Sequence, residues 1–247
     1  MRIVLAAILL TIALSVQAAN DIDAKVEAAL AAEARPQGDR DRDRNRRPLQ
    51  TLKFFGLKDD MQVLELIPGG GWYTRVLAPV LADNGKLYVA LGTGRVADTV
   101  LEEPGFDKVE VLPTTDNMHR PEGARLYTMD DFDIGVSDLD MVLTFRNVHN
   151  FDTAGRALMH RKAFGALRSG GVYGIVDHTR RHMEPDDPEN RRRIDPVLVI
   201  KEVQAAGFDF VDYSDLHYRA DDELEYEVGR RSVTGNTDRF TLLFKKP

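Results

Sequence analysis

The chain has 247 residues, which is enough for one α/β domain with a complete hydrophobic core. Its net charge of −7 argues against a general nucleic-acid-binding protein, because such proteins rely on a basic surface. It contains no cysteine, which excludes disulfides, thiolate nucleophiles and thiolate metal ligands.

The first residues of the chain predict export. Arg2 precedes an apolar run over residues 3–16, and small residues follow at Ala18 and Ala19. This order is typical of a secretory signal peptide, which we predict over residues 1–19. The run is shorter than an ordinary membrane-spanning helix, and an uncleaved anchor is the alternative interpretation. We therefore expect a periplasmic or secreted protein with no stable membrane insertion after signal cleavage.

Residues 20–47 are predicted to form an N-terminal helix followed by a charged linker. Ile22, Val26 and Leu30 would share one face of the helix. Beyond the helix, in residues 35–47, arginine and aspartate nearly alternate. One interpretation is a solvated segment with local ion pairs. The other is a lid that crosses a binding crevice and offers its arginines to an anionic ligand.

Residues 48–247 alternate apolar runs with amphipathic segments, which predicts an α/β domain. Seven strands are expected, at residues 62–67, 86–91, 108–112, 139–145, 172–176, 208–213 and 240–245. Helices are expected over residues 49–57, 72–81, 94–103, 153–168 and 194–206. Since no helix separates the last two strands, the otherwise parallel sheet is expected to end with an antiparallel strand.

The segment after the first strand is the strongest indication of a binding site. The strand carries an acid, Glu65, and Gly69, Gly70 and Gly71 follow it before an amphipathic helix. Glycines let the backbone approach a ligand closely, and a helix N-terminus presents free N–H groups to the same place. In an open parallel sheet, ligands bind beyond the strand ends. The alternative is a glycine turn that only joins a strand to a helix.

Three stretches of the chain resemble a known family. They are residues 65–74 around the glycine turn, residues 145–150 after the fourth strand, and residues 170–178 along the fifth. With the strand pattern, they are similar to the class I S-adenosylmethionine-dependent methyltransferases, and more narrowly to a group of exported bacterial predicted methyltransferases. The resemblance covers residues 48–247. It implies a Rossmann-like fold with a seven-stranded, mostly parallel sheet, an antiparallel last strand and helices on both faces.

The resemblance also implies cofactor-binding roles for several residues of this chain. Glu65 would bind the amino group of the methionine part of S-adenosylmethionine. Asp116, after the third strand, would reach the adenine amino group. Arg146 and Asn147, after the fourth strand, would lie between cofactor and substrate. The backbone of three turn residues would lie against the cofactor: Gly69, Gly70 and Gly71.

Two positions depart from the family pattern. Ile67 stands where the first glycine of the turn is normally found. Leu91 stands where an acid at the end of the second strand normally binds the ribose hydroxyls. A missing hydrogen bond to a charged group costs about 1.5–3 kcal/mol unless another group replaces it. Thr93 and Arg95 are the nearest replacements.

Candidate catalytic residues lie at the ends of the fourth and fifth strands. His149 is the first candidate for a general base, because imidazole titrates near neutral pH. The alternative is that His149 only caps or packs the following helix. Asp177 and His178 are the second candidates, although neighbours on a strand point to opposite faces and would not pair with each other. No histidine has the short ligand spacing of a metal site, so no metal is predicted.

The sequence therefore favours an enzyme that transfers a methyl group from S-adenosylmethionine to a small-molecule acceptor in the cell envelope. The alternative is a non-catalytic, methyltransferase-like module that binds a nucleoside or another metabolite. A third hypothesis is a different chemistry on the same fold. The motifs of base methylases, serine hydrolases and nicotinamide enzymes are absent. No nucleic-acid partner is expected, and the sequence does not indicate an oligomeric state.

Overall fold

The computed structural model describes residues 22–114 and 117–247 of the chain. The predicted signal peptide, residues 1–19, and the predicted adenine ligand Asp116 lie outside these ranges. Residues 22–31 form a helix. Within the described ranges, no helix is both long enough and apolar enough to cross a membrane.

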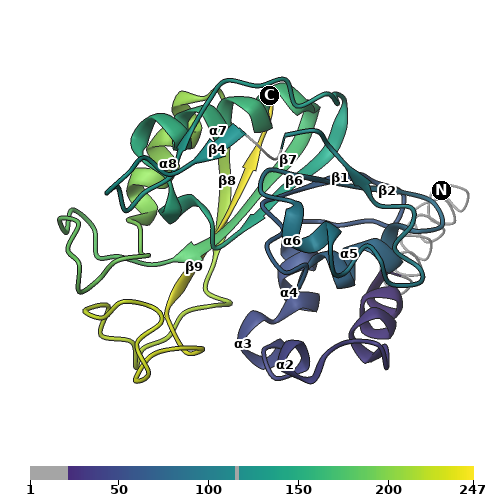
Figure 1. Cartoon of the computed structure of the whole chain (residues 1–247), viewed down its shortest axis with the longest axis horizontal. Helices are drawn as coiled ribbons and strands as arrows, with labels where there is room; N and C mark the ends of the chain where they lie inside the picture. Colours follow the sequence, from purple (N-terminus) through teal and green to yellow (C-terminus); the bar gives the residue numbers. More distant parts are fainter. Residues whose placement is uncertain (1–21, 115–116) are drawn as a thin grey trace, which may run out of the picture.

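A seven-stranded sheet forms the centre of the fold (Figure 1). In chain order its strands are β1 (Gln62–Leu66), β2 (Lys86–Ala90), β3 (Glu110–Val111), β6 (Leu139–Phe145), β7 (Leu167–His178), β8 (Asp209–Ser214) and β9 (Arg239–Lys245). Their order across the sheet is β3-β2-β1-β6-β7-β9-β8. The neighbouring pairs are parallel except for those of β9, which runs antiparallel to both β7 and β8. The predicted α/β fold, mostly parallel with an antiparallel last strand, is confirmed.

Helices cover both faces of the sheet. They are α2 (Gln37–Arg40), α3 (Asp43–Arg46), α4 (Pro48–Phe54), α5 (Thr74–Leu81), α6 (Gly94–Ala97), the short 3-10 helix η2 (Val148–Asn150), α7 (Thr153–Ala166) and α8 (Pro196–Ala205). Leu77 of α5 packs in one hydrophobic cluster with Leu143 of β6. Met159 of α7 packs in the other cluster with Val142, the neighbour of Leu143 on the same strand. Alternation along the strand therefore gives each helical layer its own core.

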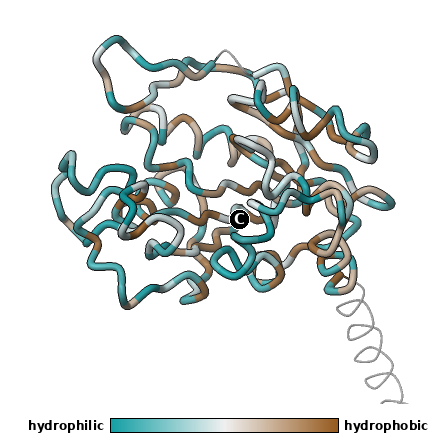
Figure 2. Tube along the Cα trace, turned by 60° about the horizontal axis from the view of Figure 1, so that its bottom comes forward, coloured by the Kyte–Doolittle hydropathy of each residue, from teal (hydrophilic) through white to brown (hydrophobic). Residues whose placement is uncertain are grey.

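The central strands are hydrophobic on both faces. Every residue of β1 after Gln62 is buried, and so is every residue of β6 except Asp140. Figure 2 shows hydrophobic residues concentrated along the central strands and hydrophilic residues along the outer loops. Strands that are covered on both faces appear in the sequence as continuous apolar runs, which explains why these two were predicted almost to the residue.

Some boundaries differ from the prediction. Helix α5 begins at Thr74, two residues late, because the preceding residues form the glycine turn. Strand β7 begins at Leu167, five residues before the predicted start, because Leu167 pairs with Leu139 ahead of a register shift. A small antiparallel hairpin, β4 (Met118–His119) with β5 (Thr128–Met129), was not predicted. Two-residue strands are too short to give a periodic pattern in the sequence.

Candidate functional site

Three strands end at one edge of the sheet, each followed by a residue in the left-handed conformation. Ile67 follows β1, Leu91 follows β2 and Arg146 follows β6, with φ angles of 56°, 64° and 65°. The left-handed region disfavours residues with a Cβ, at a cost of about 1–2 kcal/mol each. Ile67 thus adopts a conformation that favours glycine. Isoleucine therefore replaces the glycine of the family pattern at this position, while the backbone keeps the left-handed conformation.

A cavity of about 430 Å³ lies where β1 and β6 end, and we call it the glycine-turn cavity. Gly71 does not line it but packs against α6. Asp116 lies outside the described residues. The other five predicted cofactor-binding residues line the cavity: Glu65, Gly69, Gly70, Arg146 and Asn147.

Asn147 connects the end of β6 to the glycine turn. Its side-chain amide donates hydrogen bonds to the carbonyl oxygens of Leu66, at 3.3 Å, and Ile67, at 3.1 Å. These bonds fix the backbone at the point where β1 leads into the turn. Asn147 therefore holds the shape of the cavity as well as lining it.

Glu65 is a buried carboxylate in the wall of the cavity. Its residue surface is 3% exposed, and its Oε2 accepts a hydrogen bond of 2.7 Å from the hydroxyl of Thr74 at the start of α5. Burial raises the pKa of Glu65 to about 7, while the Thr74 hydrogen bond and the charge of Arg46 act in the opposite direction. Within the described residues, Thr74 is the side chain that donates to it. A ligand ammonium group would supply the missing donors and favour the charged carboxylate.

The raised pKa of Glu65 gives a prediction for stability. The pKa is about 7 in the folded protein against an ordinary value of 4.5. The folded state therefore keeps a proton that the unfolded state releases, and stability falls as the pH rises between these values. We expect Glu65→Gln, which cannot ionise, to be more stable than the parent near pH 8, on the order of 2 kcal/mol, and nearly equal near pH 4. Thermal melts at both pH values test this, and a variant that is less stable near pH 8 would contradict it.

The position expected to bind the ribose holds no acid. Leu91 is fully buried, and its backbone N–H donates to the hydroxyl of Thr114 at 2.9 Å. Arg95 lines the cavity nearby, and a Cβ built on Gly70 would lie 3.4 Å from its guanidinium carbon. Of the two replacements that the sequence suggested, Thr93 is buried and does not line the cavity. The position of the acid is therefore apolar, and the nearest charged side chain of that loop that lines the cavity is a cation, Arg95.

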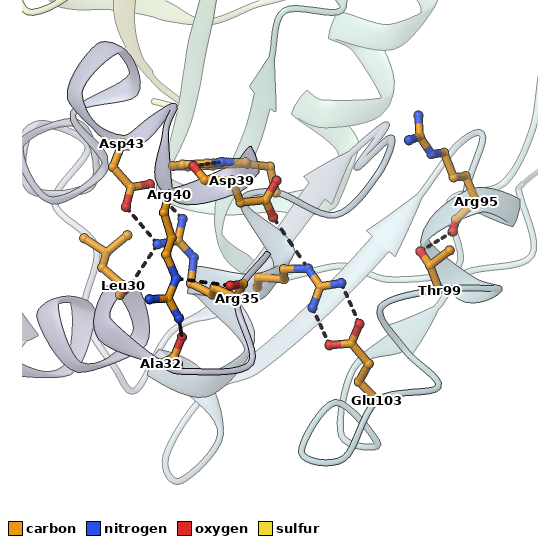
Figure 3. A network of polar contacts seen from close by, with 11 residues as sticks. Leu30, Ala32, Arg35, Asp39, Arg40, Asp43, Arg95, Thr99 and Glu103 are labelled. Atoms are coloured by element: carbon orange, nitrogen blue, oxygen red, sulfur yellow. Dashed lines mark hydrogen bonds and ion pairs between the residues drawn. The ribbon is translucent and has the colours of Figure 1, made fainter. Parts of the chain in front are cut away.

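The charged N-terminal segment, residues 35–47, forms one wall of the glycine-turn cavity. The indole N–H of Trp72 donates to the carbonyl oxygen of Asp39 at 3.0 Å, and the guanidinium carbon of Arg46 lies 4.3 Å from the centre of a Trp72 ring. The carboxylate of Asp39 lies 3.6 Å from Nε of Arg75, which makes a bidentate ion pair with Glu103 (Figure 3). The segment is thus packed on the glycine turn rather than extended in solvent.

His149 and Asp177 meet between the ends of β6 and β7. Asp177 is fully buried, and its Oδ1 lies 2.5 Å from Nδ1 of His149. Its Oδ2 accepts a hydrogen bond of 3.1 Å from the backbone N–H of His149. Asp177 pairs with this residue and not with the side chain of its neighbour His178, consistent with the alternation of side chains along a strand. A carboxylate on Nδ1 orients the imidazole and leaves Nε2 as the reactive nitrogen.

His178 lies against the same pair. Its ring centre is 5.6 Å from that of His149, and its Nδ1 lies 2.9 Å from the hydroxyl of Thr237. Burial, together with the charges of Arg239 and other cations, lowers the pKa of His178 well below its ordinary value. A histidine that stays neutral and hydrogen-bonded is a weak proton acceptor, so of the two histidines His149 is better suited to act as a base.

His149 lines a second cavity of about 460 Å³, whose lining residues differ from those of the glycine-turn cavity. Within the described residues, its Nε2 has no hydrogen-bond partner. The loop residues Arg120 and Arg191 also line this cavity. The glycine-turn cavity is lined by Arg146 and Asn147 but not by His149. The predicted base and the predicted cofactor-binding residues therefore line two different cavities.

Several residues of the glycine-turn cavity were not predicted as site residues. Tyr73 and Phe145 stack with ring centres 3.5 Å apart and planes at 8°, and both line the cavity. Neither aromatic has a spacing signal, because Tyr73 lies at the N-cap of α5 and Phe145 at the end of β6, where aromatics normally pack in the core. Arg42 and Arg46 also line the cavity, and only the interpretation of residues 35–47 as a lid had indicated a role for them in the sequence.

In the described part of the chain, no group of three or more histidine, aspartate or glutamate residues could hold a metal ion.

Comparison with solved structures supports the fold. A methyltransferase from Aquifex aeolicus described as SAM dependent is similar with a TM-score of 0.57 and 18% identity, over 82% of this chain and 91% of that chain. The glycopeptide N-methyltransferase MtfA in complex with S-adenosylhomocysteine has a TM-score of 0.53 and 14% identity, over 82% and 90%. The 4+2 cyclase SpnF has a TM-score of 0.56 and 14% identity, over 92% and 93%. No protein-family model matches the sequence, and no curated protein matches it significantly.

These similarities establish a fold like that of the class I S-adenosylmethionine-dependent methyltransferases. At such low identity they concern the fold and not the exported group or the substrate. The presence of a cyclase among the similar structures illustrates that one fold can carry different activities. Function must therefore be argued from the residues of the site.

Proposed function

We propose that this protein binds S-adenosylmethionine in the glycine-turn cavity and transfers its methyl group to a small-molecule acceptor in the cell envelope. The observation that carries the proposal is Glu65, a buried carboxylate with one side-chain donor, beside a glycine turn at the end of a central strand. The predicted signal peptide, residues 1–19, supports the location.

The residues of the cavity suit the methionine end of the cofactor. Glu65 would accept hydrogen bonds from its ammonium group, and Arg46, whose charge acts on Glu65, would bind its carboxylate. At the ribose end, Leu91 offers no carboxylate and Arg95 would approach the hydroxyls. When bound, the cofactor would supply a methyl group on a positively charged sulfur. The protein then has to align an acceptor behind that methyl and exclude water.

A base is needed when the acceptor carries a proton on the atom that attacks the methyl group. His149 is the residue we propose for this step, because Asp177 holds its Nδ1, its Nε2 has no hydrogen-bond partner among the described residues, and the residue lines the second cavity. Nε2 would accept the acceptor's proton as the new bond to the methyl carbon forms and the carbon–sulfur bond breaks. Asp177 would stabilise the resulting imidazolium by the same hydrogen bond.

Binding measurements test this proposal directly. In calorimetric titrations with S-adenosylmethionine and S-adenosylhomocysteine, we expect Glu65→Gln to raise the dissociation constant by about 10- to 100-fold, because a charged hydrogen bond is lost. The matched control is Glu27→Gln, which removes an exposed carboxylate from the N-terminal helix and should leave the affinity unchanged. Equal affinity for the parent and Glu65→Gln, or no binding at millimolar ligand, would contradict the proposal.

A second candidate function is a non-catalytic module that binds a nucleoside or another metabolite. The buried Leu91 favours it, because a catalytic site for S-adenosylmethionine normally grips the ribose with an acid at that position. This alternative predicts binding of adenosine in the same cavity, sensitive to Arg95→Gln and insensitive to Glu65→Gln. Those two variants therefore separate the candidates in one titration series.

A further inference from the structure

Four arginines gather around the inner wall of the glycine-turn cavity, and we call them the arginine cluster. Arg42 and Arg46 come from the N-terminal segment, Arg146 follows β6, and Arg239 begins β9. The first three line the cavity, and Arg239 is 6% exposed and close enough to interact electrostatically with all three. Segments far apart in the sequence thus place their positive charges in one location.

The cluster has no carboxylate partner among the described residues. The side chains of Arg42 and Arg146 make no hydrogen bond or ion pair there, and that of Arg46 only lies over Trp72. Arg239 donates from Nη1 to the carbonyl oxygen of Asn45 at 3.2 Å, while its buried Nε has no partner.

Among the described residues, the buried arginines outside the cluster each pair with a carboxylate, which sets the cluster apart from them. Arg75 pairs with Glu103, Arg156 with Glu202, and Arg193 with Asp222, each through two nitrogen atoms. A guanidinium that is buried without such a partner loses hydration without the compensating attraction of a carboxylate.

The four charges also oppose one another. Burial and then the charge of Arg146 lower the pKa of Arg46 to about 9. Burial and then Arg146 lower the pKa of Arg239 to about 10, and burial lowers the pKa of Arg146. We therefore expect the cluster to lower the stability of the ligand-free protein, and an electrostatic cost of this kind is typical of a functional site.

The acidic groups nearby do not neutralise the cluster. Asp39 faces Arg75, and Asp177, whose charge acts on Arg146, is held by His149. Glu65 has a pKa of about 7 and is only partly ionised at neutral pH. Tyr73 stays neutral, because burial raises its pKa to about 12. One carboxylate of S-adenosylmethionine would neutralise one guanidinium and leave three.

We propose that the arginine cluster binds a multiply charged oxyanion of the methyl acceptor, either a phosphate group or a pair of carboxylates. Planar guanidinium groups match both anions in bidentate geometry, and several of them around one cavity provide the charge that one such group carries. Arg146 follows β6, beside the residues that would hold the methionine end of the cofactor, so the acceptor would lie next to the transferred methyl. The inference rests on the proposed function for the identity of that neighbouring ligand.

The test uses pyrophosphate and citrate as probes, without cofactor, in calorimetric titrations at a low ionic strength of about 20 mM. We expect at least one probe to bind, and Arg146→Gln to weaken it about 10-fold or more. The matched control is Arg231→Gln, which removes an exposed arginine outside the cluster and should have no effect. Binding of pyrophosphate alone would identify a phosphate-bearing acceptor, and binding of citrate alone a polycarboxylate.

Thermal melts without any anion separate a binding role from a structural one. Because Arg146 has no partner and repels its neighbours, Arg146→Gln is expected to melt at the same temperature as the parent or higher. A lower melting temperature with unchanged probe binding would overturn the inference. It would also be overturned if neither pyrophosphate nor citrate bound. Arg42→Gln, at a half-exposed position, repeats the test if Arg146→Gln does not fold.

A titration with S-adenosylhomocysteine in parallel distinguishes the two proposals. If the probes bind and S-adenosylhomocysteine does not, the cluster is an anion site and the proposed methyl transfer is wrong. If S-adenosylhomocysteine binds and neither probe does, the proposed function stands and the anionic acceptor is wrong.

Discussion

Replacing Gly71 with alanine is expected to destabilise the folded protein by about 3–5 kcal/mol and to distort the turn on which the proposed cofactor site depends. Gly71 has a φ of 75°, and a Cβ at this position would lie 2.5 Å from Cγ2 of Val100 and 2.9 Å from Cγ2 of Val96. Both valines are fully buried, so neither can move without opening the small core under α6. The cost of backbone strain and the cost of overpacking therefore both contribute to the loss of stability in Gly71→Ala.

Gly69 provides the matched control two residues earlier. Its φ is 60°, and a Cβ there would meet no atom within 4 Å. Gly69→Ala should therefore lose about 1 kcal/mol of stability, from the left-handed conformation alone. Denaturant unfolding of both variants measures the difference. Equal losses of stability would show that the close packing of Gly71 against α6 is not what constrains the turn.

Asp222→Asn is expected to cost about 3–5 kcal/mol, because it breaks a buried ion pair and leaves a buried guanidinium without its counter-charge. Asp222 and Arg193 form two hydrogen bonds of 2.8 and 2.9 Å, and their side chains are 1% and 0% exposed. The carboxylate also accepts the backbone N–H of Leu224 and of Asp238. Asp238 lies between Thr237 and Arg239 in the sequence. Loss of its hydrogen bond to Asp222 should therefore also disturb the contact between Thr237 and His178 and the position of Arg239 in the arginine cluster.

An exposed ion pair serves as the control for Asp222→Asn. Asp23 pairs with Lys53 at 2.7 Å, with side chains 27% and 51% exposed. Asp23→Asn should cost less than about 1 kcal/mol, because solvent screens such pairs. Denaturant unfolding compares the two variants, and a loss below about 1 kcal/mol for Asp222→Asn would contradict the structural role assigned to it.

The sequence predicted the central part of the fold because that part depends on local pattern. Strands β1 and β6 are buried on both faces, so each appears as a continuous apolar run with clear ends. The glycine turn and Glu65 lie directly after or within such a run, which placed them at the edge of the sheet where ligands bind. Glu65, Gly69 and Gly70 line the glycine-turn cavity.

The sequence could not predict contacts between distant segments. Asp177 was a candidate base partner, but its pairing with His149 depends on the adjacency of β6 and β7 and on the turn after β6. The packing of residues 35–47 on Trp72 involves one indole hydrogen bond and two cation–π contacts, and none of these has a period or a motif in the sequence. The arginine cluster likewise exists only after three separate segments have folded together.

A crystal structure of the protein with S-adenosylhomocysteine tests the central claim most directly. The expected complex has the ligand's amino group within hydrogen-bonding distance of Glu65, its carboxylate on Arg46 and its ribose beside Arg95. A ligand bound in the cavity beside His149 instead, or one that leaves Glu65 without a contact, would contradict the assignment of the glycine-turn cavity as the cofactor site.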